Sequence, residues 1–350
     1  MKAKKVLCIL MALSCTAALT ACGSSSSGNA AAGSAAASSA AKSSGSAKEI
    51  VLSHVYAENH PTNTACKNFK QFVEEKSNGA LTVNIQANSV LGGDDEVLEM
   101  EAQGTVQMSI PSVASMETYD SSWSILNLPY LYTSADKMYA ALDGKLGDFL
   151  KATLDNTEFV CVGFNSNSVR DFTNNVRPIT QASDLKGIKM RVMNNNTYIK
   201  WVNALGANAT PIGYNEVFTA LQQGTVDGQE NGPDMIYESA FYEAQKYLSV
   251  SEHVYDMNAI IVNRAFYEGL TSDEKAVFDE GVKTYMVEQQ RQTILDGLND
   301  YITKLQDKGM KVNTLDDTAK GTFKTALQGV YADFEKQLGS QIWDLVRSYQ

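Results

Sequence analysis

The strongest constraint on the fold is an alternation of strand-like and helix-like segments that begins after the N-terminal region. Residues 50–56 form a strand-like segment, residues 81–87 alternate apolar and polar side chains, and residues 106–111 form a further short strand pattern. Between these segments, Pro61 begins one amphipathic helix pattern and Asp94 begins another. The order strand–helix–strand–helix–strand predicts an α/β fold, with a mostly parallel sheet that helices cover on both faces.

A second set of alternating segments continues to the C-terminus. Gly206 and Gly224 are placed to end two short helices. Thr271 and Glu274 form a capping box, which predicts the start of a long helix that reaches about Lys308. With about 300 residues to fold, the chain is long enough for two lobes with separate cores. We expect strands at residues 159–164, 188–192, 226–230 and 310–314, shorter helices at residues 197–205 and 215–223, and further helices at the C-terminus.

The first residues have the pattern of a bacterial lipoprotein export signal. Three lysines among the first five residues precede an apolar run, residues 6–19, that is too short for a comfortable transmembrane helix. The run leads into the sequence LTAC, whose last residue, Cys22, would carry the lipid after cleavage. We therefore predict a signal peptide at residues 1–21 and a membrane anchor on Cys22. The alternative is an ordinary signal peptide with a chance cysteine.

Residues 22–48 are almost wholly Ser, Ala and Gly. This composition predicts a flexible tether, because such a segment cannot bury enough apolar surface to offset its ordering entropy. Folded structure is expected from near Glu49. Two cysteines, Cys66 and Cys161, lie beyond the tether. A disulfide between them is possible in an exported protein, but we favour two buried free thiols, because one lies in a helix pattern and the other in an apolar strand pattern.

Charge and missing motifs exclude several classes of function. The chain carries −11, and removal of the three signal lysines gives −14 (−11 − 3), which argues against nucleic-acid binding and against a basic membrane-binding face. After the signal, the sequence contains none of the motifs HExxH, CxxC, GxGxxG, P-loop or GxSxG. We therefore expect no cofactor, no bound metal and no catalytic residues. The remaining enzyme hypothesis, a surface-anchored carbohydrate-active enzyme, would need two positioned carboxylates.

Arginines indicate where an anion could bind. Three of the six arginines lie between residues 170 and 191, and an arginine binds a carboxylate with a planar fork of N–H donors. Arg191 lies at the carboxyl end of the strand 188–192, where open α/β sheets bind ligands. Three asparagines, residues 194–196, follow at a helix N-terminus that favours an anion. These features predict a site for a carboxylate surrounded by hydroxyls. The alternative is a surface arginine paired with an acid, and an asparagine run selected only for turns.

Five motifs between residues 184 and 231 are similar to those of one receptor family. They are KGIKMRV at 186–192, LGA at 205–207, TP at 210–211, EVFTALQQG at 216–224 and VDGQEN at 226–231. In these motifs the chain resembles the tripartite ATP-independent periplasmic (TRAP) transporter receptors of the DctP family, with weaker similarity over about residues 48–345. Two positions depart from the pattern and leave the ligand open: Met193 stands where proline is frequent, and Gly232 precedes Pro233.

The resemblance implies a two-lobed, periplasmic-binding-protein-like (type II) fold, with mixed sheets flanked by helices and a long inter-lobe helix. Strands cross between the lobes in such receptors. Lobe I is expected to comprise residues 49–168 plus about 257–296, and lobe II about 169–256 plus 297–350. Hinge closure between the lobes would bury the ligand. The membrane subunits of a TRAP transporter are the implied partners, and transport would be coupled to ions rather than to nucleotide.

The resemblance also implies ligand-binding residues. The family's arginine in the KGxKxR segment forms a salt bridge with the ligand carboxylate, and its position here is Arg191. Arg170 matches an arginine that supports this contact, and Asn231 matches an asparagine that contacts the same carboxylate. The other candidates are Tyr214, which can pack against the ligand, Asn194 in the asparagine run, and His54 and Ser112, which would line the opposite lobe. Core packing of Tyr214 and a structural role for His54 are open alternatives.

The predicted ligand is a small organic acid. One carboxylate with several hydroxyls favours an acidic sugar such as a hexuronate. A C4-dicarboxylate or a keto acid is the alternative within the same transporter class. A dicarboxylate would need a second cationic anchor in the opposite lobe, and none can be named from the sequence. A sensor subunit that presents the same ligand is a further alternative, and it would lack a transporter partner.

Overall fold

The computed structural model describes residues 47–350. The predicted signal peptide, the lipidation site at Cys22 and nearly all of the predicted tether lie outside these residues. Lys48, the last residue of the predicted tether, already belongs to the first strand. Among the described residues, no helix is both long enough and apolar enough to cross a membrane.

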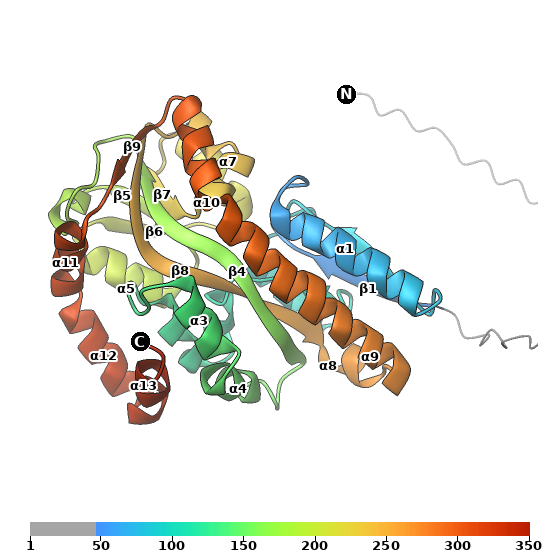
Figure 1. Cartoon of the computed structure of the whole chain (residues 1–350). Coiled ribbons are helices and arrows are strands. Elements are labelled where there is room, and N and C mark those ends of the chain that lie inside the picture. Colours follow the sequence, from blue (N-terminus) through green and yellow to red (C-terminus); the bar gives the residue numbers. More distant parts are fainter. Residues whose placement is uncertain (1–46) are drawn as a thin grey trace, which may run out of the picture. The chain divides into compact units, whose positions relative to one another are not determined.

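Within the described residues, nine strands form one mixed sheet in the order β2–β1–β3–β8–β4–β7–β5–β6, with β9 paired to β8 (Figure 1). β1 pairs in parallel with β2 and β3, and β5 pairs in parallel with β6 and β7. The prediction of a mostly parallel sheet is correct for these two groups and wrong for the centre, where β4 and β8 run antiparallel. The strands are β1 Lys48–Ser53, β2 Leu81–Gln86, β3 Met108–Ser109, β4 Phe159–Asn174, β5 Lys189–Val192, β6 Asn208–Pro211, β7 Gly228–Asn231, β8 Tyr247–Asn263 and β9 Lys311–Thr314.

The two central strands depart most from the predicted elements. β4 continues far beyond the predicted segment 159–164, and β8 lies where no strand was predicted. Their middle portions are polar yet buried, because the polar side chains bond to one another. Asn258 donates to the side-chain oxygen of Asn165 at 2.8 Å, and Asn167 donates to the carboxylate of Asp256 at 2.8 Å. Strands of this kind show neither the alternation nor the apolar run by which strands are recognised in a sequence.

Helices begin where local capping groups are available. α1 (Pro61–Lys76) begins at a proline, and the imidazole of His60 accepts a hydrogen bond from the Thr62 N–H at 3.1 Å. α2 (Asp94–Ala102) has three acids in its first turn, which suits the positive end of the helix dipole. The other helices are α3 Ala135–Leu142, α4 Lys145–Ala152, α5 Asn196–Ala204, α6 Val217–Gln222, α7 Pro233–Glu238, α8 Arg264–Glu268, α11 Asp317–Ala326, α12 Gln328–Leu338 and α13 Ser340–Arg347.

The predicted long helix is present, with a π-helical segment inside it. Thr271 and Glu274 form the expected capping box at its start. In Figure 1 the helix runs beside β4 and α1, and Gln290 fixes it to β4 by two hydrogen bonds, of 2.8 and 2.9 Å, with the backbone of Ser166. Its segments are α9 (Ser272–Gly281), a π-helix (Val282–Gln289) and α10 (Gln290–Asp307).

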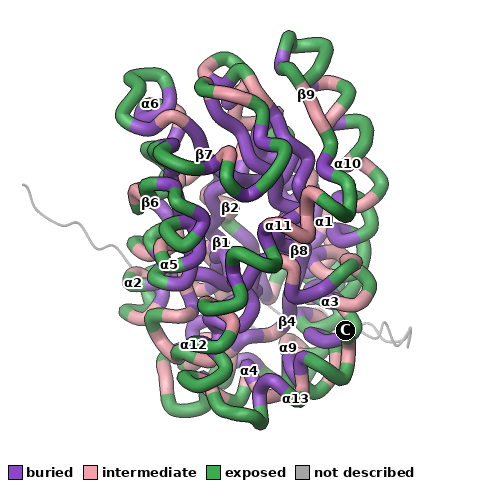
Figure 2. Tube along the Cα trace, turned by 90° about the vertical axis from the view of Figure 1, so that its left-hand side faces the viewer, coloured by how far each residue is buried: buried purple, intermediate pink, exposed green. Residues whose placement is uncertain are grey.

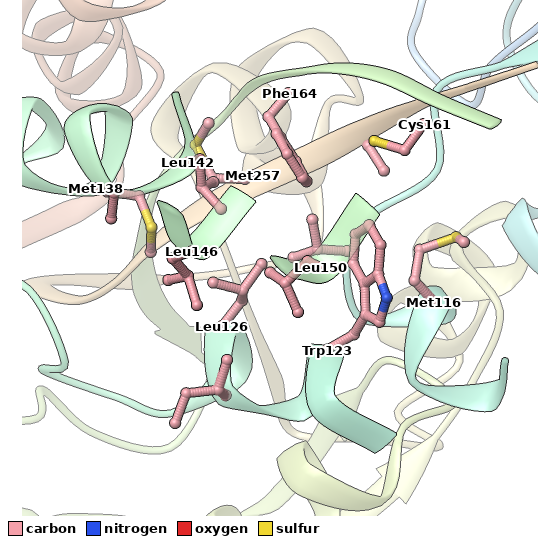
Figure 3. Packing of buried hydrophobic residues seen from close by; sticks show 14 of the residues in the cluster. Met116, Trp123, Leu126, Met138, Leu142, Leu146, Leu150, Cys161, Phe164 and Met257 are labelled. Carbon is pink, nitrogen blue, oxygen red and sulfur yellow. The ribbon is translucent and has the colours of Figure 1, made fainter. Parts of the chain in front are cut away.

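Four clusters of buried apolar side chains fill the space between sheet and helices, and Figure 2 shows buried residues along the strands with exposed ones on the outer helices. In the cluster of Figure 3, Trp123 packs with Leu150 and Phe164. The C-terminal residues Phe334 and Trp343 belong to the same cluster. Residues predicted for the end of lobe II therefore pack against residues predicted for lobe I.

Both cysteines of the folded region are buried and free. Cys66 lies in α1 and Cys161 in β4, and they do not form a disulfide, which confirms the favoured interpretation. Burial raises the pKa of the Cys161 thiol to about 11 and that of Cys66 still further. Neither thiol is therefore ionised to a useful extent at neutral pH.

Candidate functional site

A cavity at the carboxyl ends of the parallel strands is the candidate site. Its volume is about 340 Å³. The lining residues follow β1, β3, β5, β6 and β7, and others come from the N-terminus of α2 and the middle of β4 and β8. Carboxyl ends of parallel strands meet at one edge of a sheet, and open α/β sheets bind ligands there. Segments that are far apart in the sequence therefore meet at a single site.

Arg191 lies at the end of β5, and part of its guanidinium has no protein partner. The residue is only 2% exposed. Its Nε donates to the carbonyl oxygen of Ile212 at 2.9 Å, whereas Nη1 is buried without a hydrogen-bond partner among the described residues. Burial lowers the pKa of Arg191 to about 10, so the side chain stays charged at neutral pH. A buried cation with a free donor at a cavity is suited to bind an anion.

Arg170, on β4, lines the same cavity but is held by two buried acids. It donates to the carboxylate of Glu230 at 2.5 and 2.7 Å and to that of Asp256 at 2.7 Å. Burial tends to raise the pKa of Glu230, but Arg170 outweighs burial and lowers that pKa below its ordinary value. Burial raises the pKa of Asp256 to about 6, although Arg170 opposes the rise. The protein itself therefore balances the charge of Arg170.

Four more of the predicted residues line the cavity. The hydroxyl of Tyr214 lies 2.6 Å from that of Ser239, which fixes the ring while leaving it partly exposed. Asn231 is buried at the end of β7, where its amide donates to the side-chain oxygen of Gln229 at 2.6 Å. Together with Tyr214 and Asn231, the other two predicted residues that line the cavity are Asn194 and Ser112.

His54 lies outside the cavity lining, although it was predicted to face the ligand. Its ring is buried, and Nε2 lies 3.2 Å from the side-chain oxygen of Asn63 in α1. Burial lowers the pKa of His54 to about 4, so the ring is neutral at pH 7. The following residues, Val55 and Tyr56, line the cavity instead.

Several polar residues of the site were not predicted. The Tyr56 hydroxyl lies 2.8 Å from the side-chain oxygens of both Asn167 and Asn258, and all three residues line the cavity. The sequence contained one usable signal, the polar run NSNS at residues 165–168, because a buried strand holds such residues only where they have polar partners.

Asp94 was predicted only as the start of a helix, and it is one of the α2 acids that line the cavity. One of its carboxylate oxygens accepts the Ser112 N–H at 2.9 Å. Burial raises the pKa of Asp94 to about 7; Ser112 and Arg191 oppose the rise, and Asp95 adds to it. The site therefore combines an uncompensated arginine with a carboxylate and a set of amide and hydroxyl groups.

Groups that could hold a metal are absent from residues 47–350, where no three His, Cys, Asp or Glu side chains are suitably arranged. The donors and acceptors around the cavity suit a small polar anion. Binding such a ligand requires only complementary charge and hydrogen bonds.

Residues 52–337 match the family described as bacterial extracellular solute-binding protein, family 7, also called DctP. The chain belongs to this family. The match confirms the resemblance inferred from the motifs at residues 184–231, and it makes the chain a member of an extracytoplasmic family of solute-binding proteins.

Individual relatives are similar to this chain along most of their length. A solute-binding protein of Verminephrobacter eiseniae is 33% identical over 84% of this chain and 87% of its own. The sugar acid binding protein DctPAm of Advenella mimigardefordensis, in complex with galactonate, has a TM-score of 0.84 and 27% identity, covering 87% of this chain and 99% of that chain. A TRAP periplasmic solute binding protein of Shewanella oneidensis with bound succinate has a TM-score of 0.83 and 29% identity, with the same coverage of 87% and 99%. The two-lobed α/β fold is thereby confirmed.

Proposed function

We propose that this solute-binding protein captures a small organic acid, with an acidic sugar such as a hexuronate favoured, and delivers it to a TRAP-type membrane transporter. The observation that carries this proposal is the buried guanidinium of Arg191, which lines the cavity and bonds the described chain through Nε alone, so that its terminal nitrogens lack a partner there. A ligand carboxylate would supply that partner and compensate the charge. Family membership and the acids bound by two related structures support the same assignment.

The residues around Arg191 have distinct roles in this proposal. Arg191 binds the carboxylate through its fork of donors, and Asn231 contacts the same group. Arg170 acts indirectly: it holds Glu230 in place, and the charge of Glu230 opposes the fall that burial causes in the pKa of Arg191. Tyr214 offers a partly exposed ring face to the ligand. The side chains of Asn194 and Ser112 are available to hydroxyl groups.

Closure of the two predicted lobes would bury the ligand, and contacts across the cavity support a closed form. Asn194, before α5, donates to Asp95 of α2 at 3.2 Å. Asn195 and Thr197 donate to the carboxylate of Glu117 at 2.8 and 2.7 Å. These contacts join residues predicted for lobe II to residues predicted for lobe I, so they would form only when the lobes approach each other.

We also propose that the mature chain is anchored to the outer face of the cytoplasmic membrane through lipid on Cys22. The sequence pattern of residues 1–22 supports this part of the proposal. Metabolic labelling with a fatty acid should mark the wild-type chain and leave Cys22→Ala unmarked. A wild-type chain without label would remove the anchor. No catalytic role is proposed, since the relatives are solute-binding proteins.

A direct test is calorimetric titration of the mature protein with acids selected by a thermal-shift screen over sugar acids, dicarboxylates and keto acids. Arg191→Ala should weaken binding by about 2–5 kcal/mol, because it leaves the ligand carboxylate buried without its partner. Arg191→Lys should also weaken it, since a point charge lacks the fork. Lys189→Ala is the matched control, because this lysine is exposed on the same strand and outside the cavity lining. Unchanged affinity in Arg191→Ala would remove Arg191 from this role.

A C4-dicarboxylate is the second candidate ligand, because a related structure has bound succinate. The same titration separates the two classes. Tighter binding of succinate than of any sugar acid would replace the favoured ligand and leave the receptor function intact.

A further inference from the structure

The charged side chains around the cavity are unevenly distributed. Among the described lining residues the cations are Arg170 and Arg191, and the protein already neutralises Arg170 through Glu230 and Asp256. One cation therefore remains for a ligand. The acids of the lining are Asp94, Asp95, Glu96 and Glu216.

Two of the α2 acids are engaged by the protein. The Glu96 carboxylate accepts the Gly93 N–H at 2.9 Å and so caps its own helix. The Asp95 carboxylate accepts from Asn194 at 3.2 Å. These partners reduce the capacity of both acids to contact a ligand.

Asp94 differs from both because only half of its carboxylate is used. Oδ2 accepts the Ser112 N–H at 2.9 Å. Within residues 47–350, Oδ1 has no protein donor, and it is not among the fully buried unpaired atoms, so it remains accessible at the cavity. Ser112 fixes the carboxylate. Above about pH 7, where Asp94 is ionised, this leaves a positioned anionic acceptor beside the cavity.

Arg191 and Asp94 act on each other across the cavity without forming an ion pair. Arg191 opposes the rise that burial causes in the pKa of Asp94, and Asp94 in turn opposes the fall that burial causes in the pKa of Arg191. Arg191 belongs to β5, whereas Asp94 belongs to α2. Because both line the cavity, a ligand bound there meets a cation from β5 and an anion from α2.

We propose that Asp94 determines ligand class: it accepts hydrogen bonds from the hydroxyls of an acid whose carboxylate binds Arg191, and it repels a second carboxylate. The inference rests on the proposed function, since it takes Arg191 as the carboxylate anchor. A hydroxylated monocarboxylate satisfies both ends of the cavity. A C4-dicarboxylate would bring its second carboxylate close to the carboxylate of Asp94. The repulsion between these two negative charges is stronger in a desolvated site than in water.

The test is calorimetric titration of the mature chain at about pH 8.5, where Asp94 is ionised, with D-glucuronate, succinate and n-hexanoate, which has the carboxylate but no hydroxyls. Wild type should prefer D-glucuronate to both other acids. Asp94→Asn should weaken D-glucuronate binding about tenfold, because a charged acceptor becomes neutral. It should also strengthen succinate binding, because the repulsion is gone. The asparagine oxygen can still accept the Ser112 N–H, so the variant should fold, which thermal unfolding checks.

The matched control is Glu99→Gln, which makes the same charge change on the same helix at an exposed residue outside the lining. It should leave the ratio of glucuronate to succinate affinity unchanged. If glucuronate binds and depends on Arg191, yet Asp94→Asn leaves that ratio as in wild type, the inference alone is overturned. A wild type that prefers succinate also overturns it. If no acid binds wild type, or binding is insensitive to Arg191→Ala, the proposed function fails and the inference fails with it.

Discussion

Buried ionisable groups in residues 47–350 differ in whether a charged partner compensates them, and this difference separates structural groups from those of the site. Arg170 is fully paired, with two carboxylates within 2.7 Å, and it joins β4 to β7 and β8. Arg191 bonds the described chain through Nε alone, and it lines the cavity, where a ligand anion would compensate its charge. Glu101 is a third case, an acid at 0% exposure whose only side-chain partner is the Ser109 hydroxyl among the described residues.

Glu101 should make folding stability depend on pH. Burial raises its pKa from 4.5 to about 8, so the folded state holds a proton that the unfolded state releases. Stability from this group is therefore present below about pH 4.5 and is lost progressively as pH rises to about 8. Since one pKa unit corresponds to about 1.4 kcal/mol, the loss should be on the order of 5 kcal/mol. Glu101→Gln should flatten this dependence in urea unfolding measured across that range. An unchanged slope would show that Glu101 is ionised in the folded protein.

Residue roles were predictable where they lie within a continuous motif. Arg191 stands at a strand end beside an asparagine run that suggested an anion site, and Asn231 was assigned through the resemblance to the DctP family; both line the cavity. Asp94 and Asn167 could not be assigned in this way, because their importance arises from segments that only the fold brings near them. His54 was predicted from its place at a strand end, but its ring bonds Asn63 rather than facing the cavity.

Strand β7 is the element on which the site depends most directly. It carries Glu230 and Asn231, and it packs so closely on β4 that Gly228 has no room for a side chain. A Cβ at Gly228 would lie 2.2 Å from the Thr173 carbonyl oxygen. The strand can move only if the sheet pairing around it changes.

Gly228→Ala should therefore destabilise the protein by about 1–3 kcal/mol through overpacking. It should also weaken ligand binding, since β7 would shift together with Asn231. Gly321→Ala in α11 is the matched control, because no atom lies within 4 Å of its added Cβ. That control should be neutral or stabilising by up to about 1 kcal/mol. Denaturant unfolding of both variants measures the difference, and equal stabilities would contradict the packing argument.

Sequence patterns could identify two kinds of element: those that bury one apolar face and expose the other, and those whose buried side chains are all apolar. The α1 helix and the capping box at Thr271 and Glu274 are examples, and both occur as predicted. β8 was not predicted because its buried residues include the polar Ser249, Ser251 and Asp256. In a search for hydrophobic patterns, such residues indicate a loop rather than a strand. Their burial is possible only with polar partners from other strands, and a single sequence does not reveal those partners.

At the scale of the whole molecule, ligand binding and closure should be coupled. Glu117 lies outside the cavity lining, but its carboxylate accepts from Asn195 at 2.8 Å and from Thr197 at 2.7 Å. Asn195 also donates to the Ala114 carbonyl at 2.7 Å. These bonds link residues predicted for lobe I to residues predicted for lobe II, outside the cavity lining, so they should stabilise the closed form without touching the ligand.

Glu117→Ala should weaken ligand affinity about tenfold, because two hydrogen bonds to a charged group are lost from the closed form only. The open form makes no use of them, so the thermal stability of ligand-free protein should change less than that of the complex. Glu280→Ala removes an exposed acid with no bond to another described side chain, and it should leave affinity unchanged. Calorimetric titration gives the affinities, and small-angle scattering with saturating ligand reports whether the variant still closes. If Glu117→Ala binds as tightly as wild type, then these contacts do not contribute to closure, and burial of the ligand must depend on the cavity residues alone.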